Sequence, residues 1–197
     1  MDRTWRITAA DAVGGAALSI AVVAACVLTQ LHWLTAVGAG AIALAGPALA
    51  RIDLTVRRLP NPLTLPLLGI GATIAIVHAV LGDWVGPVVA LGAAALLFVM
   101  NLVGGMGMGD VKLGAAVALA LSASPASVLT ALVASFVLGG LVGIGALVLG
   151  HRTLPFGPFL VAGMLAGVAA AAVGAGGSHG LPVTRMPRLR PTVTAGR

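Results

Sequence analysis

Seven runs of apolar residues, separated by short polar segments, account for most of the chain. None of the runs alternates apolar and polar residues in the way that strands of a membrane barrel do. Backbone polar groups inside a bilayer must be satisfied within their own segment, so the runs predict helices. Most of them approach the about 20 residues that one crossing requires. The runs cover residues 12–31, 33–50, 63–81, 85–103, 111–121, 127–149 and 158–173.

The run at 111–121 is too short to cross a bilayer alone. We expect it either to complete its crossing with residues 122–126 or to begin below the membrane surface, where the glycine-rich stretch before it dips inward. The expected fold is an all-α, polytopic transmembrane bundle of about seven helices with short loops. Residues 1–32 would add an extra N-terminal transmembrane helix to a membrane domain at 33–173. The basic tail at 174–197 is expected to be disordered.

Composition supports this fold class, because 59% of the residues are hydrophobic and only 8% are charged. Soluble domains average about 25% charged residues, so a water-soluble fold is excluded. Cys26 is the only cysteine, which excludes an internal disulfide and a zinc site built from several cysteines. No basic helix and no basic patch interleaved with aromatic residues is present, which argues against nucleic acid as a partner.

The basic residues predict an orientation for the bundle. Arg51, Arg57 and Arg58 lie between the second and third runs, and Arg152 lies between the sixth and seventh. Short loops that carry arginine face the cytoplasm, where their charges also meet lipid headgroups. The arginines of the tail fit less well, since the helix count places 174–197 on the outer side.

The first segment with candidate chemistry follows the second run. Asp53 is one of only five acidic residues, all aspartates, and the rigid sequence Pro60-Asn61-Pro62 separates it from the next run. A surface ion pair between Asp53 and Arg51 or Arg57 is the simplest explanation of this aspartate taken alone.

The second segment is the glycine-rich sequence 104–113, in which Gly107 and Gly109 lead directly to Asp110 and Lys112. Irregular backbone at membrane depth is tolerated where it is buried in protein or lines a wet cavity. A carboxylate in that setting is a candidate functional group. The alternative is an ordinary helix start, at which Asp110 complements the helix dipole.

The helix count brings both aspartates to the cytoplasmic side of the bundle. Aspartyl hydrolysis needs one ionised carboxyl that takes a proton from water and one protonated carboxyl that donates a proton. Two neighbouring carboxyls supply both forms, because they share a proton over a wide pH range. No other catalytic set is visible: the four histidines are scattered without metal-ligand spacing, and no serine lies in a G-x-S-x-G context. Neither a metal nor another cofactor is expected.

Three stretches of this sequence resemble the type IV prepilin peptidases, members of the GxGD membrane aspartyl proteases. Asp53 with Arg57, Pro60 and Asn61 resembles the first aspartate motif of that family, and residues 105–113 resemble its G-x-G-D-V-K-L motif. The third stretch, L-P-F-G-P-F-L at 154–160, resembles its P-F-G-P-F-L segment. The likeness extends over about 33–173, which would make that part a GxGD peptidase membrane domain.

The resemblance implies an endopeptidase of the bacterial inner membrane with its active site facing the cytoplasm. It would cleave prepilin or pseudopilin precursors after a glycine that ends a short basic leader. Asp53 and Asp110 would be the catalytic pair, without a decision on which acts as base. Gly107 and Gly109 would shape the backbone around Asp110, and Lys112 would bind headgroups or a nearby polar group. A turn beside the substrate groove is implied for Pro155, Phe156, Gly157 and Pro158.

Three further points limit this interpretation. Longer relatives in the family resemble this chain plus a cysteine-containing region associated with methylation, so we expect peptidase activity without methyltransferase activity. The presenilin group also uses G-x-G-D but expects a tyrosine before its first aspartate, and this sequence has no tyrosine. The alternative from another class is a non-enzymatic membrane protein that uses the same aspartates, either a proton-coupled transporter or a pilin-binding relic. The sequence leaves the substrate's identity and the oligomeric state open.

Overall fold

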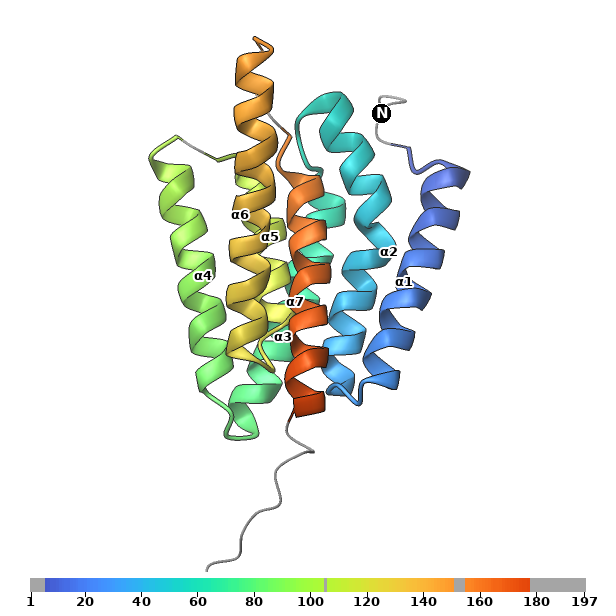
Figure 1. Ribbon diagram of the computed structural model, residues 1–197, viewed down its shortest axis with the longest axis vertical. Coiled ribbons are helices and arrows are strands. Elements are labelled where there is room, and N and C mark those ends of the chain that lie inside the picture. Colours follow the sequence, from blue (N-terminus) through green and yellow to red (C-terminus); the bar gives the residue numbers. More distant parts are fainter. Residues whose placement is uncertain (1–5, 105, 151–154, 178–197) are drawn as a thin grey trace, which may run out of the picture.

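The computed structural model describes residues 6–104, 106–150 and 155–177. Within these ranges the chain is all-helical and forms seven helices, which confirms the predicted fold class (Figure 1). The helices are α1 (Ala9–Leu28), α2 (Trp33–Val56), α3 (Asn61–Val80), α4 (Val85–Leu102), α5 (Met108–Ala120), α6 (Pro125–Val148) and α7 (Gly157–Gly177).

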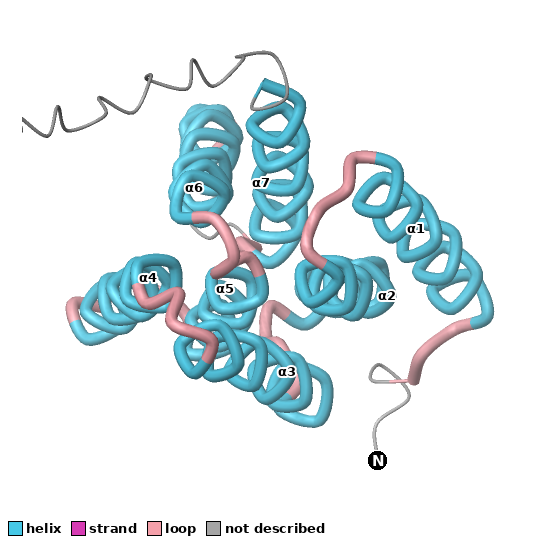
Figure 2. Tube along the Cα trace, turned by 90° about the horizontal axis from the view of Figure 1, so that it is seen from below, coloured by secondary structure: helices cyan, strands magenta, loops and turns pink. Residues whose placement is uncertain are grey.

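Six of the helices are long and apolar enough to cross a bilayer, and α5 is the exception. With 13 residues, α5 is about 20 Å long, shorter than the about 30 Å of a hydrocarbon core. Figure 2 shows α5 near the centre of the bundle, surrounded by α2, α3, α4, α6 and α7, whereas α1 lies outside against α2. Nine of the α5 residues are buried. The chain is therefore a multi-pass membrane protein built around one short, enclosed helix.

Two helix boundaries differ from the predicted ones at the places where the aspartates lie. The second helix continues beyond residue 50 to Val56, so Asp53 lies inside its last turns. Arg51, Asp53 and Thr55 in these added turns all have hydrogen-bond partners, and the C-cap residue is Arg57, in a left-handed conformation (φ 55°). The apolar run ends before the helix does because the last turns carry charged and polar side chains.

The fifth helix begins at Met108 rather than at residue 111, which places Asp110 in its first turn. The N-cap residue is Gly107, whose extended backbone (φ −70°, ψ 142°) enters the helix without a side-chain cap. The third helix begins at Asn61, with Pro60 as its N-cap residue and Pro62 in the first turn, a position that proline favours.

Glycines allow α5 to lie close to its neighbours. A Cβ atom on Gly71 of α3 would lie 2.8 Å from the Ala116 carbonyl oxygen of α5. A Cβ atom on Gly86, in the first turn of α4, would collide with the Ser122 carbonyl that follows α5. Small residues promote helix association in membranes because they let backbones approach. The position of α5 therefore depends on particular glycines in its neighbours.

Replacement of Gly71 tests this packing. We expect Gly71→Ala to lower the thermal midpoint of unfolding, because the added methyl group meets backbone atoms of α5. Overpacking of this kind costs about 1–3 kcal/mol, which equals or exceeds the about 1 kcal/mol that alanine gains over glycine in a helix. The matched control is Gly69→Ala on the same helix, where no heavy atom lies within 4 Å of the added Cβ. Equal midpoints for the two variants, measured in the same detergent, would contradict the close contact.

Candidate active site

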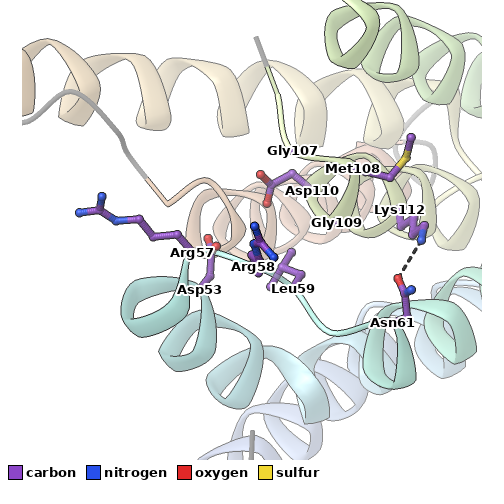
Figure 3. A pocket seen from close by; sticks show the side chains of 10 residues that line it. All are labelled: Asp53, Arg57, Arg58, Leu59, Asn61, Gly107, Met108, Gly109, Asp110 and Lys112. Carbon is purple, nitrogen blue, oxygen red and sulfur yellow. Dashed lines mark hydrogen bonds between the residues drawn. The ribbon is translucent and has the colours of Figure 1, made fainter. Parts of the chain in front are cut away.

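A cavity of about 460 Å³ lies where α2 ends and α5 begins (Figure 3). Its lining comes from two segments far apart in the sequence, and both aspartates singled out above belong to it. The ten lining residues are Asp53, Arg57, Arg58, Leu59, Asn61, Gly107, Met108, Gly109, Asp110 and Lys112. The sequence motifs around the two aspartates therefore meet in space.

Asp53 is buried at the cavity wall, with only 4% of its surface exposed. Its Oδ2 atom accepts a hydrogen bond of 2.8 Å from the backbone N–H of Gly157, the first residue of α7. A Cβ atom on Gly157 would lie only 2.9 Å from that same oxygen. A side chain at residue 157 would therefore shift the Asp53 carboxylate, and the contact joins α2 to α7 at the cavity.

Asp110 is half-buried in the first turn of α5, outside the six spanning helices. Its Oδ1 atom is buried and has no hydrogen-bond partner among the described residues. Burial, and after it the neighbouring Asp53 carboxylate, raises the pKa of Asp110 to about 7. The two carboxyl groups are therefore close enough to influence each other, and together they retain a proton near neutral pH.

Two contacts hold the start of α5 against the connection between α2 and α3. A Cβ atom on Gly109 would lie 2.8 Å from the Leu59 Cβ atom, so the two backbones pass as closely as glycine permits. The Lys112 Nζ atom donates a hydrogen bond of 2.8 Å to the Asn61 Oδ1 atom (Figure 3). Lys112 thus binds a nearby polar group, one of the two roles expected for it.

The surface ion pair considered for Asp53 is not made with Arg51. The Arg51 side chain binds Asp11 instead, with its Nε atom 3.0 and 2.9 Å from the two carboxylate oxygens. Asp53 faces the cavity and α7, and it accepts a hydrogen bond from the Gly157 backbone. Among the described residues, no group of three or more His, Cys, Asp or Glu side chains is placed to hold a metal ion.

Comparison with protein families identifies the group of proteins to which the segment that forms this cavity is similar. The model of the type IV leader peptidase family matches residues 41–144. This chain belongs to the type IV leader peptidase family. The matched segment contains all ten residues that line the cavity, whereas α1 and α7 lie outside it. Comparison with curated proteins and with solved structures gave no match.

In this leader peptidase, residues 155–160 of the third family-like stretch contact Asp53 through Gly157 but do not line the cavity. The Phe156 ring packs against Phe136 of α6 and Phe159 of α7, with ring centroids 5.4 and 6.1 Å away. Neither Pro155, Phe156 nor Pro158 is among the residues that line the cavity. Within the predicted turn, Gly157 is the residue that donates a hydrogen bond to Asp53. The expected position of the Pro155–Pro158 turn beside a substrate groove stays a prediction.

Several positions of the sequence prediction lie outside the described residues. They are Gly105, Arg152, Leu154 and the tail from 178 onwards. Residues 174–177, which were expected to belong to the disordered tail, instead form the end of α7. Four lining residues were not among the predicted site residues: Arg57, Arg58, Leu59 and Met108. Each lies within or beside a predicted motif in the sequence, and this proximity was the only available signal.

Substitution of Gly157 tests whether the contact with α7 matters to this leader peptidase. In Gly157→Ala, the new methyl group forces the Asp53 carboxylate away from the N–H that it accepts. A displacement of about 1 Å in an active site can cost about 100-fold in rate, so we expect a loss of peptidase activity of at least about tenfold. Gly140→Ala on α6 is the matched control, because its Cβ would meet no heavy atom within 4 Å. Undiminished cleavage by purified Gly157→Ala protein would contradict the importance of this contact.

Proposed function

We propose that this chain is an aspartyl endopeptidase that removes the leader of prepilin-like precursors at the cytoplasmic face of the bacterial inner membrane. One observation carries the proposal: in a member of the type IV leader peptidase family, Asp53 and Asp110 come from distant segments and line the same cavity. Family membership supports a membrane peptidase, and the paired carboxyl groups supply the chemistry.

The surroundings of the two carboxyl groups favour different protonation states. Both carboxyl groups accept a backbone N–H, Asp53 from Gly157 and Asp110 from Gly107. They differ in that Asp110 also has a buried oxygen without a partner, and burial together with the Asp53 carboxylate raises its pKa to about 7, which favours its protonated form. We therefore assign Asp53 as the base and Asp110 as the acid for the first step of hydrolysis.

The proposed reaction uses one water molecule and returns both groups to their starting states. Asp53 takes a proton from water while the water oxygen attacks the scissile carbonyl carbon, and Asp110 gives its proton to the carbonyl oxygen. The C–N bond of the tetrahedral intermediate then breaks. The amine leaves with the proton held by Asp53, and Asp110 regains a proton from a hydroxyl of the intermediate.

The distribution of basic residues supports a cavity that faces the cytoplasm. Arg57, Arg58 and Lys112 all line the cavity. The connections at the opposite end of the bundle, residues 29–32, 81–84 and 121–124, contain no lysine or arginine. This asymmetry follows the positive-inside rule. A cavity at the cytoplasmic end suits a precursor whose cleavage site directly precedes an apolar membrane helix.

Coexpression with a precursor pilin tests the proposal. We expect Asp53→Asn and Asp110→Asn each to abolish the size shift of the precursor, with a fall in rate of at least about 100-fold, the usual loss when an acid or base is removed. Asp83→Asn is the matched control, because Asp83 is half exposed and lies at the other end of the bundle beside His78. All variants should reach the membrane in equal amounts.

The alternative predicts a different result. If precursor pilins are still processed by both asparagine variants, the aspartates do not perform the hydrolysis. Altered proton flux or pilin binding in the same variants would then favour the non-enzymatic membrane protein. Processing by Asp83→Asn at the rate of the wild type would show that loss of an aspartate does not by itself impair the protein.

The pH dependence of cleavage gives a second test. Since the pKa of Asp110 is raised to about 7, this carboxyl loses its proton, and with it the ability to act as an acid, as the pH rises through about 7. We expect the cleavage rate of purified protein to fall on that alkaline side in a series from about pH 5 to about pH 9. Asp83→Asn should keep the same profile. A rate that is constant or increases above about pH 7 would argue against Asp110 as the acid.

A further inference from the structure

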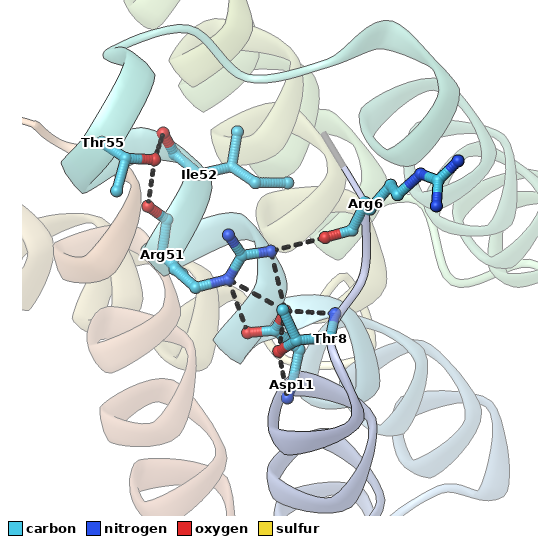
Figure 4. Close-up of polar contacts among 6 residues, drawn as sticks. All are labelled: Arg6, Thr8, Asp11, Arg51, Ile52 and Thr55. Carbon is cyan, nitrogen blue, oxygen red and sulfur yellow. Dashed lines mark hydrogen bonds and ion pairs between the residues drawn. The ribbon is translucent and has the colours of Figure 1, made fainter. Parts of the chain in front are cut away.

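Asp11 of α1 and Arg51 of α2 form an ion pair (Figure 4). Arg51 lies two residues before Asp53 in the sequence. The Arg51 Nε atom contacts both Asp11 carboxylate oxygens, and an Arg51 terminal nitrogen lies 2.8 Å from Asp11 Oδ2. The Asp11 side chain is 6% exposed, whereas that of Arg51 is 33% exposed. Because the guanidinium group is planar and contacts both oxygens, it fixes the orientation of Arg51 relative to Asp11 as well as the distance between them.

The same carboxylate also organises the beginning of α1. The backbone N–H of Thr8 donates a hydrogen bond of 2.8 Å to Asp11 Oδ2, and the Asp11 N–H donates one of 3.2 Å to the Thr8 hydroxyl oxygen, which forms a capping box. The Thr8 hydroxyl also donates to Asp11 Oδ2, at 2.8 Å. The second Arg51 contact, of 2.8 Å, reaches the carbonyl of Arg6 (Figure 4). Arg51 is thus bound to a rigid helix start rather than to a single mobile side chain.

The part of α2 that carries Asp53 follows a gap in the helical hydrogen bonding. Pro47 lies inside α2 and has no N–H, so the carbonyl of Ala43 lacks its usual helical hydrogen bond. Residues 48–56 form the last turns beyond this weak point. They are held on one side through Arg51 and Asp11, and on the other side through Asp53 and the Gly157 N–H.

We propose that Asp11 and Arg51 are positioning residues for Asp53. By binding the side of α2 that faces α1, they set the direction of its last turns and therefore the place of the Asp53 carboxylate in the cavity. The effect on catalysis rests on the proposed function, whereas the effect on the position of residues 48–56 does not. Neither residue lines the cavity, and Asp11 lies outside the segment matched by the family model.

The experiment compares precursor cleavage by variants of the full chain in lipid nanodiscs. Asp11→Asn keeps the shape of the side chain but removes its charge. We expect kcat to fall about tenfold or more, since a small displacement of a catalytic group is costly, while KM changes by less than about twofold because no cavity residue is altered. Asp11→Glu keeps the carboxylate and should recover most of the lost rate.

The matched control is Val22→Ala, a substitution of a buried α1 residue away from the ion pair. It loosens the packing of α1 without touching Arg51, so its kcat per folded molecule should equal that of the wild type. An equal fall in kcat for Val22→Ala and Asp11→Asn would overturn the proposal, because the ion pair would then act only through the general packing of α1.

Hydrogen exchange provides a readout that does not require cleavage. We expect amides in residues 48–57 to exchange faster in Asp11→Asn than in Val22→Ala, and unchanged exchange there would also overturn the proposal. If that exchange increases but the wild type cleaves no precursor, the proposed function fails and the positioning contact stands. Should Asp11→Asn not fold, Arg51→Lys, which keeps the charge but loses the fork, should give a smaller fall in kcat and the same region of faster exchange.

Discussion

A carboxyl group inside an apolar bundle has to be satisfied by the protein around it, and for Asp53 this is done by one backbone N–H of Gly157. Hydrogen bonds to charged groups contribute about 1.5–3 kcal/mol, so this contact offsets only part of the cost of burial. Its geometry depends on a missing side chain, since any Cβ at residue 157 would displace the acceptor. A shift of α7 relative to α2 would therefore move the Asp53 carboxylate within the candidate active site.

The same dependence on glycine explains how a short helix can present Asp110 below the end of the bundle. Because α5 is too short to cross the bilayer, Asp110 in its first turn lies outside the six spanning helices. Gly109 lets this turn lie against Leu59, and Gly71 lets α3 lie against the middle of α5. Gly107 and Met108 just before Asp110 are exposed, whereas Asp110 is half-buried, so the carboxyl group lies at the boundary between the cavity and the packed helices.

The number of helices, their class and the two aspartate segments could be predicted because they follow from local signals: apolar runs, prolines, and a glycine-rich stretch that ends in an acidic residue. The contacts that complete the cavity could not. The hydrogen bond of Lys112 to Asn61 and the pairing of Arg51 with Asp11 join residues far apart in the chain. The extension of α2 to Val56 carries polar side chains whose partners lie on other helices, so the apolar run ended too early to reveal it.

The Asp11–Arg51 pair is a poor device for stability alone. The Arg51 side chain is one-third exposed, and ion pairs open to solvent contribute little to stability. Apolar packing by the fully buried Leu49 and Ile52 holds this part of α2 in the bundle, and the ion pair adds a directional contact that sets its rotation. A fork that meets two carboxylate oxygens, themselves fixed by Thr8, defines that rotation. The ion pair therefore fixes the orientation of the last turns of α2. The nearest group whose orientation matters for the proposed chemistry is the Asp53 carboxylate.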